Sequence, residues 1–240
     1  DGGDFDTVED ALAQVERMIA QGAAVIDVGG ESTRPGAEFV TEEEEIARIV
    51  PVIQAIKAKY DVLISIDTYK TATARAALEA GADILNDVWA GLYDGQMLAI
   101  AAKKNVPIIL MHNQKEEVYN DVTEDVCTFL SQRAQAALEA GVAKDNIWID
   151  PGFGFAKNVQ HNIDLLKGLD KVVALGYPVL FGISRKRVVD YLLGGNTQAK
   201  DRDQGTAALS GYAVSKGCQI VRVHNVDANR DIVKTISGIL

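Results

Sequence analysis

Short apolar runs and longer amphipathic segments alternate along the chain. The spacing of Val8, Leu12, Val15 and Ile19 places apolar side chains on one face of a helix. Nearly continuous apolar runs, in contrast, are typical of parallel strands that are buried on both faces. Such runs predict seven strands, at about residues 24–28, 62–67, 84–87, 107–112, 147–150, 179–183 and 220–224.

Helix signals fill the segments between these strands. Thr41 and Glu44 form a capping-box pattern ahead of an isoleucine-rich helix, in which Pro51 is a candidate for a kink. Further helices are predicted over residues 72–80, 96–104, 124–140, 162–175, 206–215 and 228–239. Glycines follow several helices at the usual C′ position, namely Gly22, Gly81, Gly141, Gly176 and Gly217.

Eight predicted helices and seven predicted strands therefore alternate, with a helix first. A right-handed series of this kind closes as an eight-stranded barrel. We predict an α/β chain, a (β/α)8 TIM barrel that apparently lacks its first strand, forming a single domain over residues 1–240. A doubly wound open sheet is the weaker alternative, because an open sheet of seven parallel strands would leave two edges exposed.

Composition narrows the class of protein. The chain has 240 residues and a mean hydropathy of +0.02, which suits one large globular domain. A net charge of -10 disfavours nucleic acid or an anionic membrane as a partner. Cys127 and Cys218 form no CxxC motif or disulfide framework, and the sequence shows no membrane-spanning stretch or signal peptide. We therefore expect a cytoplasmic protein.

Polar clusters follow several of the predicted strands. In a parallel barrel the carboxyl ends of the strands build the active site. Asp67, Asn86 and Asp150 each end a different strand, and together they offer acceptors and an amide to a heterocycle with several N–H groups. The alternative is that each caps the helix that follows, and in the pair Asn86 and Asp87 either side chain suits that role.

Cationic residues also follow the strands and indicate an anionic ligand. Arg34 lies in a glycine-containing loop, residues 27–36, where it either binds an anion or is solvated. Residues 184–187 place three cations after an apolar run, which favours a site over a solvated charge run. Arg222 and His224 are two residues apart, so they would share one face of the last strand and clamp an anion, unless His224 is a core residue.

A second glycine-rich loop, residues 150–157, carries Phe153 and Phe155, which either stack on a planar ligand or pack under the loop. His112 ends a strand and is either a site residue or packing, and His161 is expected at the surface before a helix. The sequence contains no metal-ligand spacing, nucleophilic triad or dinucleotide fingerprint.

Taken together and in this order, the motifs resemble those of the dihydropteroate synthase family, over essentially the whole chain. They are DVGGESTRPG (27–36), SIDTYK (65–70), Asn86-Asp87, DPGFGFAK (150–157), SRK (184–186) and RVH (222–224). The resemblance implies a (β/α)8 barrel and a transferase of folate biosynthesis that joins 4-aminobenzoate to 6-hydroxymethyl-7,8-dihydropterin diphosphate and releases pyrophosphate. It also implies a homodimer, Mg2+ and sensitivity of the family to sulfonamides.

The resemblance also implies a role for individual residues. Pterin binding falls to Asp67, Asn86, Asp150, Lys186 and Arg222. Binding of 4-aminobenzoate falls to Thr33, Arg34, Pro35, Phe155 and Lys186. Diphosphate binding falls to Arg222, His224 and Asn225, and the catalytic set is Asp67, Lys186, Arg222 and His224.

Three departures from the family pattern bear on these expectations. The family's first strand, with an Asn that helps bind Mg2+, would precede Asp1, so no metal ligand can be named. Asn225 stands where Asp is usual, and Phe153 replaces an aliphatic residue. Three rival functions remain. One is a methyltetrahydrofolate–corrinoid methyltransferase, which would have less use for the cation clamp, and another is a barrel that binds pterin without turnover. The third is a generic phosphate-binding barrel, which fits poorly with so many acceptors at strand ends.

Overall fold

The computed structural model describes residues 7–33 and 37–240, in which helices alternate with seven strands. The chain forms two compact units. Unit 1 comprises Asp1–Ile109 and Ala137–Asn146, and unit 2 comprises Leu110–Ala136 and Ile147–Leu240. The single domain that the sequence suggests stays a prediction. Among the described residues, no helix is both long and apolar enough to cross a membrane.

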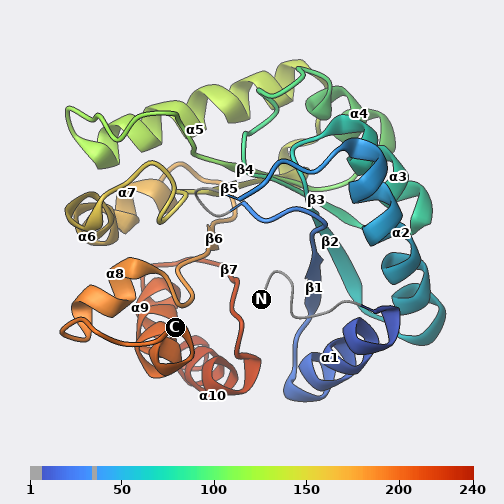
Figure 1. Cartoon of the computed structure of the whole chain (residues 1–240). Coiled ribbons are helices and arrows are strands. Elements are labelled where there is room, and N and C mark those ends of the chain that lie inside the picture. Colours follow the sequence, from blue (N-terminus) through green and yellow to red (C-terminus); the bar gives the residue numbers. More distant parts are fainter. Residues whose placement is uncertain (1–6, 34–36) are drawn as a thin grey trace. The chain divides into compact units, whose positions relative to one another are not determined.

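Unit 1 contains parallel strands flanked by helices, and neighbouring strands follow the order of the chain (Figure 1). Asp27 lies beside Ser65 in the register, and Asp67 lies beside Asn86. The helices α1, α2, α3 and α4 contact one another in that order. The elements are α1 Val8–Gln21, β1 Val25–Val28, α2 Glu42–Lys59, β2 Leu63–Asp67, α3 Thr71–Ala80, β3 Ile84–Asp87, α4 Met97–Lys104 and η1 Lys144–Asn146. Strand β4, Ile108–Met111, contributes residues to both units.

The predicted helix signals of unit 1 are confirmed. The hydroxyl of Thr41 accepts from the backbone N–H of Glu44 at 3.2 Å, and the Glu44 carboxylate accepts from the Thr41 N–H at 3.2 Å. This capping box satisfies N–H groups that a helix start leaves unpaired. Helix α2 continues through Pro51 to Lys59. Gly22 and Gly81 end their helices with φ of 102° and 115°, a region that favours glycine.

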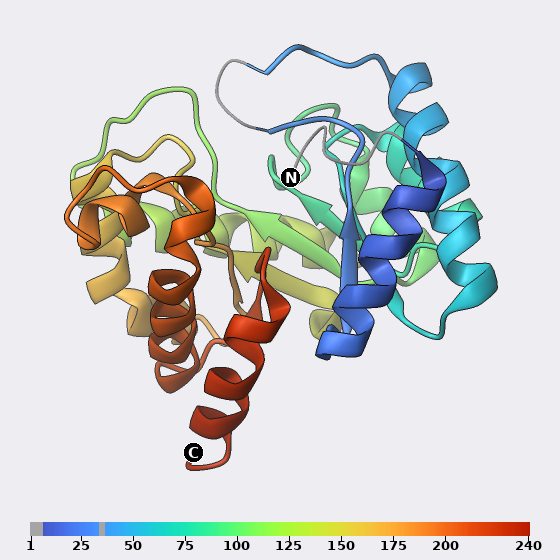
Figure 2. The same cartoon turned by 60° about the horizontal axis from the view of Figure 1, so that its bottom comes forward.

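Unit 2 continues the alternation of strands and helices. Strands β6 and β7 are paired and parallel, and Ile149 of β5 bridges to Val179. Helices α9 and α10 lie side by side (Figure 2). The elements are α5 Val122–Glu139, β5 Ile147–Asp150, α6 Val159–Lys167, α7 Leu169–Val173, β6 Leu180–Phe181, α8 Arg187–Leu192, η2 Ala199–Arg202, α9 Asp203–Ser215, β7 Ile220–Val221 and α10 Val226–Ser237.

The core of unit 2 encloses both cysteines of the chain. Phe153 and Phe181 pack edge to face within it, with ring centroids 5.1 Å apart. Cys127 and Cys218 belong to the same buried cluster. Burial raises the pKa of the Cys127 thiol and raises that of Cys218 to about 12, because an apolar environment disfavours the thiolate.

The last predicted strand is shorter than the sequence suggests. The backbone N–H of Arg222 bonds the Phe181 carbonyl at 3.0 Å, and there the neighbouring strand β6 ends. The N–H of His224 instead bonds the Ser184 hydroxyl at 3.2 Å. Strand β7 ends at Val221, so Arg222 and His224 lie after it, and the prediction that they share a face of the last strand is wrong.

Two helix predictions in unit 2 are also wrong. The helix predicted over residues 162–175 is divided at Gly168, and helix α8 lies where none was predicted. Gly168 lies against Thr123, so close that an added Cβ would be 2.6 Å from the Thr123 methyl group. The sequential order of neighbouring strands is also unlike a doubly wound sheet, in which the order reverses.

Candidate functional site

In unit 1, polar side chains meet at the carboxyl ends of the parallel strands. The Ser65 hydroxyl donates to the Asp27 carboxylate at 2.6 Å, and the Asn86 amide donates to the same oxygen at 3.5 Å. Asp67 is 8% exposed and lies beside Asn86 in the register. Asp67 and Asn86 are predicted site residues, whereas Asp27 and Ser65 have no individual role in the sequence-based prediction. A serine within the buried strand LISID was the signal for the latter.

The helix-capping alternative fails for both of the selected residues. Helix α3 has Lys70 at its N-cap position, so Asp67 does not cap it. Asp87 accepts from the N–H groups of Trp89 at 2.8 Å and Gly91 at 2.6 Å. Asp87 is therefore the turn residue of the pair, which leaves the Asn86 amide to contact Asp27.

A buried lysine holds the segment that follows β1. Lys70 is fully buried, and its ammonium donates to the Glu31 carboxylate, to the Val40 carbonyl and to Glu45. Glu31 and Val40 lie on either side of Thr33, a residue predicted to bind 4-aminobenzoate. Arg34 and Pro35, with the same predicted role, lie outside the described residues.

In unit 2, Asp150 ends β5 as a buried carboxylate, 6% exposed. Its oxygen accepts from the Gly152 N–H at 2.7 Å, whereas Asn158 caps the following helix α6. Burial raises the pKa of Asp150, and the Lys186 ammonium, the Gly152 N–H, Arg222 and Lys157 each oppose that rise. Asp150 is therefore an acceptor surrounded by cations, not a helix cap.

Lys186 and Phe155 form a cation–aromatic pair in unit 2. The Lys186 ammonium lies 4.7 Å from the centre of the Phe155 ring and also donates to the Phe153 carbonyl. Phe155 is half-buried, while Phe153 is fully buried in the core. Phe155 is thus the aromatic of this loop that can face a ligand. Phe153 packs beneath it, as the packing alternative predicts.

The other two cations after β6 are Arg185, which pairs with a carboxylate, and Arg187, which is exposed. Arg185 forms two bonds to Asp203, from Nε at 2.6 Å and from Nη2 at 2.9 Å. This pair lowers the pKa of Asp203. Arg187 is exposed as the first residue of α8. Of the three predicted cations, Lys186 contacts the 150–157 loop, through the Phe153 carbonyl and the Phe155 ring.

The predicted diphosphate residues occupy the segment after β7. Nδ1 of His224 lies 2.8 Å from the Ser184 hydroxyl, and Arg222 is exposed. Asn225 caps α10 by accepting from the Ala228 N–H at 3.1 Å, and its amide donates to Asp203 at 2.8 Å. The cap and the bond to Asp203 explain how this chain uses Asn225.

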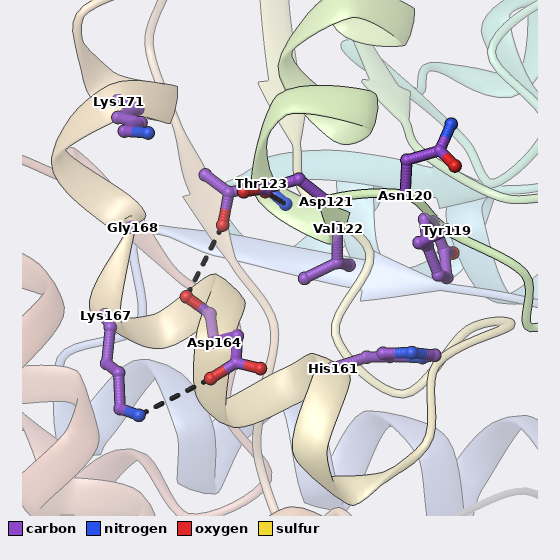
Figure 3. Close-up of a pocket in the computed structure, with 10 residues that line it drawn as sticks. All are labelled: Tyr119, Asn120, Asp121, Val122, Thr123, His161, Asp164, Lys167, Gly168 and Lys171. Carbon is purple, nitrogen blue, oxygen red and sulfur yellow. Dashed lines mark hydrogen bonds and ion pairs between the residues drawn. The ribbon is translucent and has the colours of Figure 1, made fainter.

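A polar pocket of about 440 Å³ also lies in unit 2, between the start of α5 and the helices α6 and α7 (Figure 3). Lys167 lies 3.4 Å from Asp164, and Lys171 lies 2.5 Å from Glu124. The lysines of this pocket are therefore paired with carboxylates. None of the predicted site residues lines the pocket, so it is separate from the candidate site.

Comparisons with known proteins define the class. A family model described as "Pterin binding enzyme" matches residues 1–224, which makes the chain a pterin-binding enzyme. Dihydropteroate synthase of Streptococcus pyogenes serotype M6 is 73% identical over 240 residues, covering 100% of this chain and 90% of the relative.

Two solved structures of Xanthomonas albilineans dihydropteroate synthase each cover 100% of this chain and 87% of their own. One, with 4-aminobenzoic acid, has 41% identity and a TM-score of 0.93. The other, in complex with 7,8-dihydropteroate, has 39% identity and a TM-score of 0.90. The chain belongs to the dihydropteroate synthase family. Its fold is the α/β barrel of that family, which confirms the predicted fold class, whereas the absence of the first strand stays a prediction.

Proposed function

We propose that this chain condenses 6-hydroxymethyl-7,8-dihydropterin diphosphate with 4-aminobenzoate, giving 7,8-dihydropteroate and pyrophosphate in folate biosynthesis. The observation that best supports this function is the 73% identity to a dihydropteroate synthase along the whole chain. The similar Xanthomonas structures contain 4-aminobenzoic acid in one case and 7,8-dihydropteroate in the other. The same relatives favour this reaction over corrinoid-dependent methyl transfer.

We assign pterin recognition to strand-end acceptors. Asp67 and Asn86 of unit 1 and Asp150 of unit 2 offer carboxylates and an amide, which match the N–H groups and ring acceptors of a pterin. The bond from Asn86 to Asp27 makes Asp27 a further member of this set. Lys186 and Arg222 complete the assignment on the strength of the family resemblance.

We assign 4-aminobenzoate to Phe155 and Lys186, with Thr33. An aromatic ring beside a cation suits a substrate that is itself a benzene ring with a carboxylate. The contact of 4.7 Å between the Lys186 ammonium and the Phe155 ring supports this role. Arg34 and Pro35 belong to the same proposal through the family motif alone.

The proposed chemistry is a displacement at the pterin methylene carbon. The bond from carbon to the diphosphate oxygen breaks, the bond from carbon to the arylamine nitrogen forms, and the amine then gives up one proton to solvent. An arylamine is a weak nucleophile and diphosphate is a good leaving group, so departure of diphosphate runs ahead of attack. Arg222 and His224 stabilise the leaving anion, while Asp67 and Asp150 favour positive charge on the pterin.

We further propose that the protein uses Mg2+, forms a homodimer and is located in the cytoplasm. Among the described residues no group of three His, Cys, Asp or Glu side chains could hold a metal, so no step is assigned to Mg2+. The diphosphate itself would supply oxygen ligands of the kind that Mg2+ prefers. The homodimer rests on the family resemblance, and the two buried thiols suit a reducing compartment.

The assignment is tested with the variants Lys186→Ala and Asp67→Asn. Removing one preorganised group should lower kcat/KM on the order of 10²-fold. Turnover is followed by pyrophosphate release, with folding checked by circular dichroism and with the exposed Lys234→Met as the control. Near-native turnover of both folded variants would refute the assignment. Calorimetric binding of the pterin diphosphate without any turnover by the native chain would instead show a binding protein.

A further inference from the structure

Lys157 is a buried cation at the end of the 150–157 loop, and the proposed chemistry leaves it without a role. It is 5% exposed, and its ammonium has three partners. It donates to the carbonyls of Gly152 and Phe155, each at 3.0 Å, and lies 2.9 Å from Nδ1 of His112. An ammonium carries three N–H groups, so each has an acceptor. A buried charge is costly to retain unless it is bonded in this way.

His112 provides the anchor on the neighbouring strand end. It is 2% exposed, and its pKa is lowered to about 3 by burial and then by the Lys157 charge. The ring is therefore neutral at working pH, and its Nδ1 accepts from the ammonium while Nε2 carries the hydrogen. The His112 ring also packs edge to face on Phe129, with centroids 4.8 Å apart.

A second contact ties the same loop to the segment after β4. The Tyr119 hydroxyl donates to the Ala156 carbonyl at 2.9 Å, and its ring packs on His161 at 4.9 Å. The backbone approach is close, since a Cβ on Gly152 would lie 2.0 Å from the His112 carbonyl oxygen. Lys157 thus fastens a turn that already lies directly against the end of β4.

The turn that Lys157 holds carries the proposed substrate contacts. The Gly152 N–H bonds the Asp150 carboxylate at 2.7 Å, and the Phe153 carbonyl accepts from Lys186. Phe155 lies under the Lys186 ammonium. We propose that Lys157 is a positioning residue: by bonding Gly152, Phe155 and His112 it fixes the turn that presents Phe155 and Lys186 to 4-aminobenzoate. This inference rests on the proposed function.

A kinetic difference between the two substrates distinguishes positioning from general stability. Phe155 is bonded directly by Lys157, whereas Asp150 is also fixed by strand β5. Loss of the ammonium should therefore act mainly on 4-aminobenzoate. We expect Lys157→Met to lower kcat/KM for 4-aminobenzoate on the order of 10²-fold, because small misplacements have effects of that size. The KM for the pterin diphosphate should change several-fold less.

The experiment compares steady-state kinetics of Lys157→Met, Lys157→Gln and Lys234→Met, each checked for folding by circular dichroism. Lys157→Gln keeps two N–H donors, so it should recover part of the loss, and the exposed Lys234→Met should behave as the native chain. Unchanged kcat/KM in a folded Lys157→Met chain, or equal losses for both substrates, overturns the positioning role. If Lys186→Ala is also fully active, the proposed function fails with it. A loss in Lys186→Ala alone refutes only the inference.

If Lys157→Met does not fold, the native chain supplies the test. Burial lowers the pKa of Lys157 to about 7, with Asp150 opposing that shift and Lys186 adding to it. Proton loss removes one of the three donors, so the KM for 4-aminobenzoate should rise as pH increases through about 7. His112 stays neutral there, and burial raises the pKa of Tyr119, so neither titrates in this range. A KM for 4-aminobenzoate that stays constant from neutral to mildly alkaline pH overturns the inference.

Discussion

Asp150 is a buried carboxylate that must be charged for the role proposed for it. A carboxylate accepts N–H groups of a pterin on both oxygens, whereas the protonated acid has less acceptor capacity. Burial raises the pKa of Asp150 above the usual 3.8, although Lys186 and the Gly152 N–H limit the rise. In the proposed role of Asp150, pterin affinity should therefore be more sensitive to mild acid than it would be with an exposed carboxylate.

We expect the affinity for a pterin ligand to fall as pH decreases through the raised pKa of Asp150. The variant Asp150→Asn should bind more weakly at neutral pH and should lose this part of the pH dependence. Calorimetric titrations between about pH 4 and 8 measure both effects. The idea fails if the native chain and the variant show the same pH dependence.

The Ser184 hydroxyl contacts His224 through both its ring and its backbone. This hydroxyl lies 2.8 Å from Nδ1 of His224 and accepts from the His224 backbone N–H at 3.2 Å. We expect Ser184→Ala to lower kcat about tenfold, because the His224 imidazole would lose the contact that fixes its orientation for the proposed stabilisation of the leaving diphosphate. The KM for 4-aminobenzoate should stay constant.

The matched control for Ser184 is Ser215→Ala. Within the part of the chain that the structure describes, the Ser215 hydroxyl donates only to a carbonyl of its own helix, that of Tyr212, at 2.7 Å. Steady-state kinetics of the two variants should differ in kcat. Equal kcat values in the Ser184 and Ser215 variants would show that the hydroxyl does not orient His224.

Helices α6 and α7 show how one residue divides an element. The apolar spacing over residues 162–175 is continuous, so the sequence predicts one helix. At Gly168 the backbone leaves the helical region, with φ -92° and ψ 14°, and Thr123 of α5 packs against it. Tertiary contact of this kind is not visible in local periodicity, because Thr123 lies far away along the chain.

We expect Gly168→Ala to destabilise unit 2 by about 1–3 kcal/mol, the usual cost of overpacking. The added methyl group would lie 2.6 Å from the Thr123 methyl group. Gly238→Ala is the control, since its Cβ would lie 3.4 Å from the nearest atom at a φ of -77°. Urea unfolding curves measure the difference. Equal stability of the two variants would contradict the packing argument.

Strands and their ends differ in how far the sequence predicts them. Burial on both faces requires continuous apolar runs, so the seven strands were predictable. Their ends depend on the neighbouring strand, and for this reason the last strand stops at Val221 instead of residue 224. The strand-end residues Asp67, Asn86 and Asp150 were predictable because each interrupts an apolar run.

Across the molecule, the order of elements was enough to predict the fold class. Buried polar clusters were not predictable, because they join segments that are distant in the sequence. The bond from Lys157 to His112 spans 45 residues, and that from Lys70 to Glu31 spans 39. Local patterns treat such lysines as surface residues, since lysine is seldom buried unless it is paired.

Lys157 also links stability to pH. Its pKa is lowered from 10.5 to about 7 in the folded chain, so the unfolded chain binds more protons between these values. The free energy of unfolding should therefore increase as pH rises from about 7 toward 10. Lys157→Met should lack this increase. Urea unfolding at several pH values tests it, and identical pH dependence in the native chain and the variant would contradict it.

The buried thiols in the core of unit 2 have a practical consequence. Alkylating reagents attack the thiolate, and both Cys127 and Cys218 are enclosed and hold their protons tightly. Modification by iodoacetamide must then wait until this half of the chain opens. The rate at which the two native cysteines are alkylated therefore reports how often the core of unit 2 opens, without an engineered label.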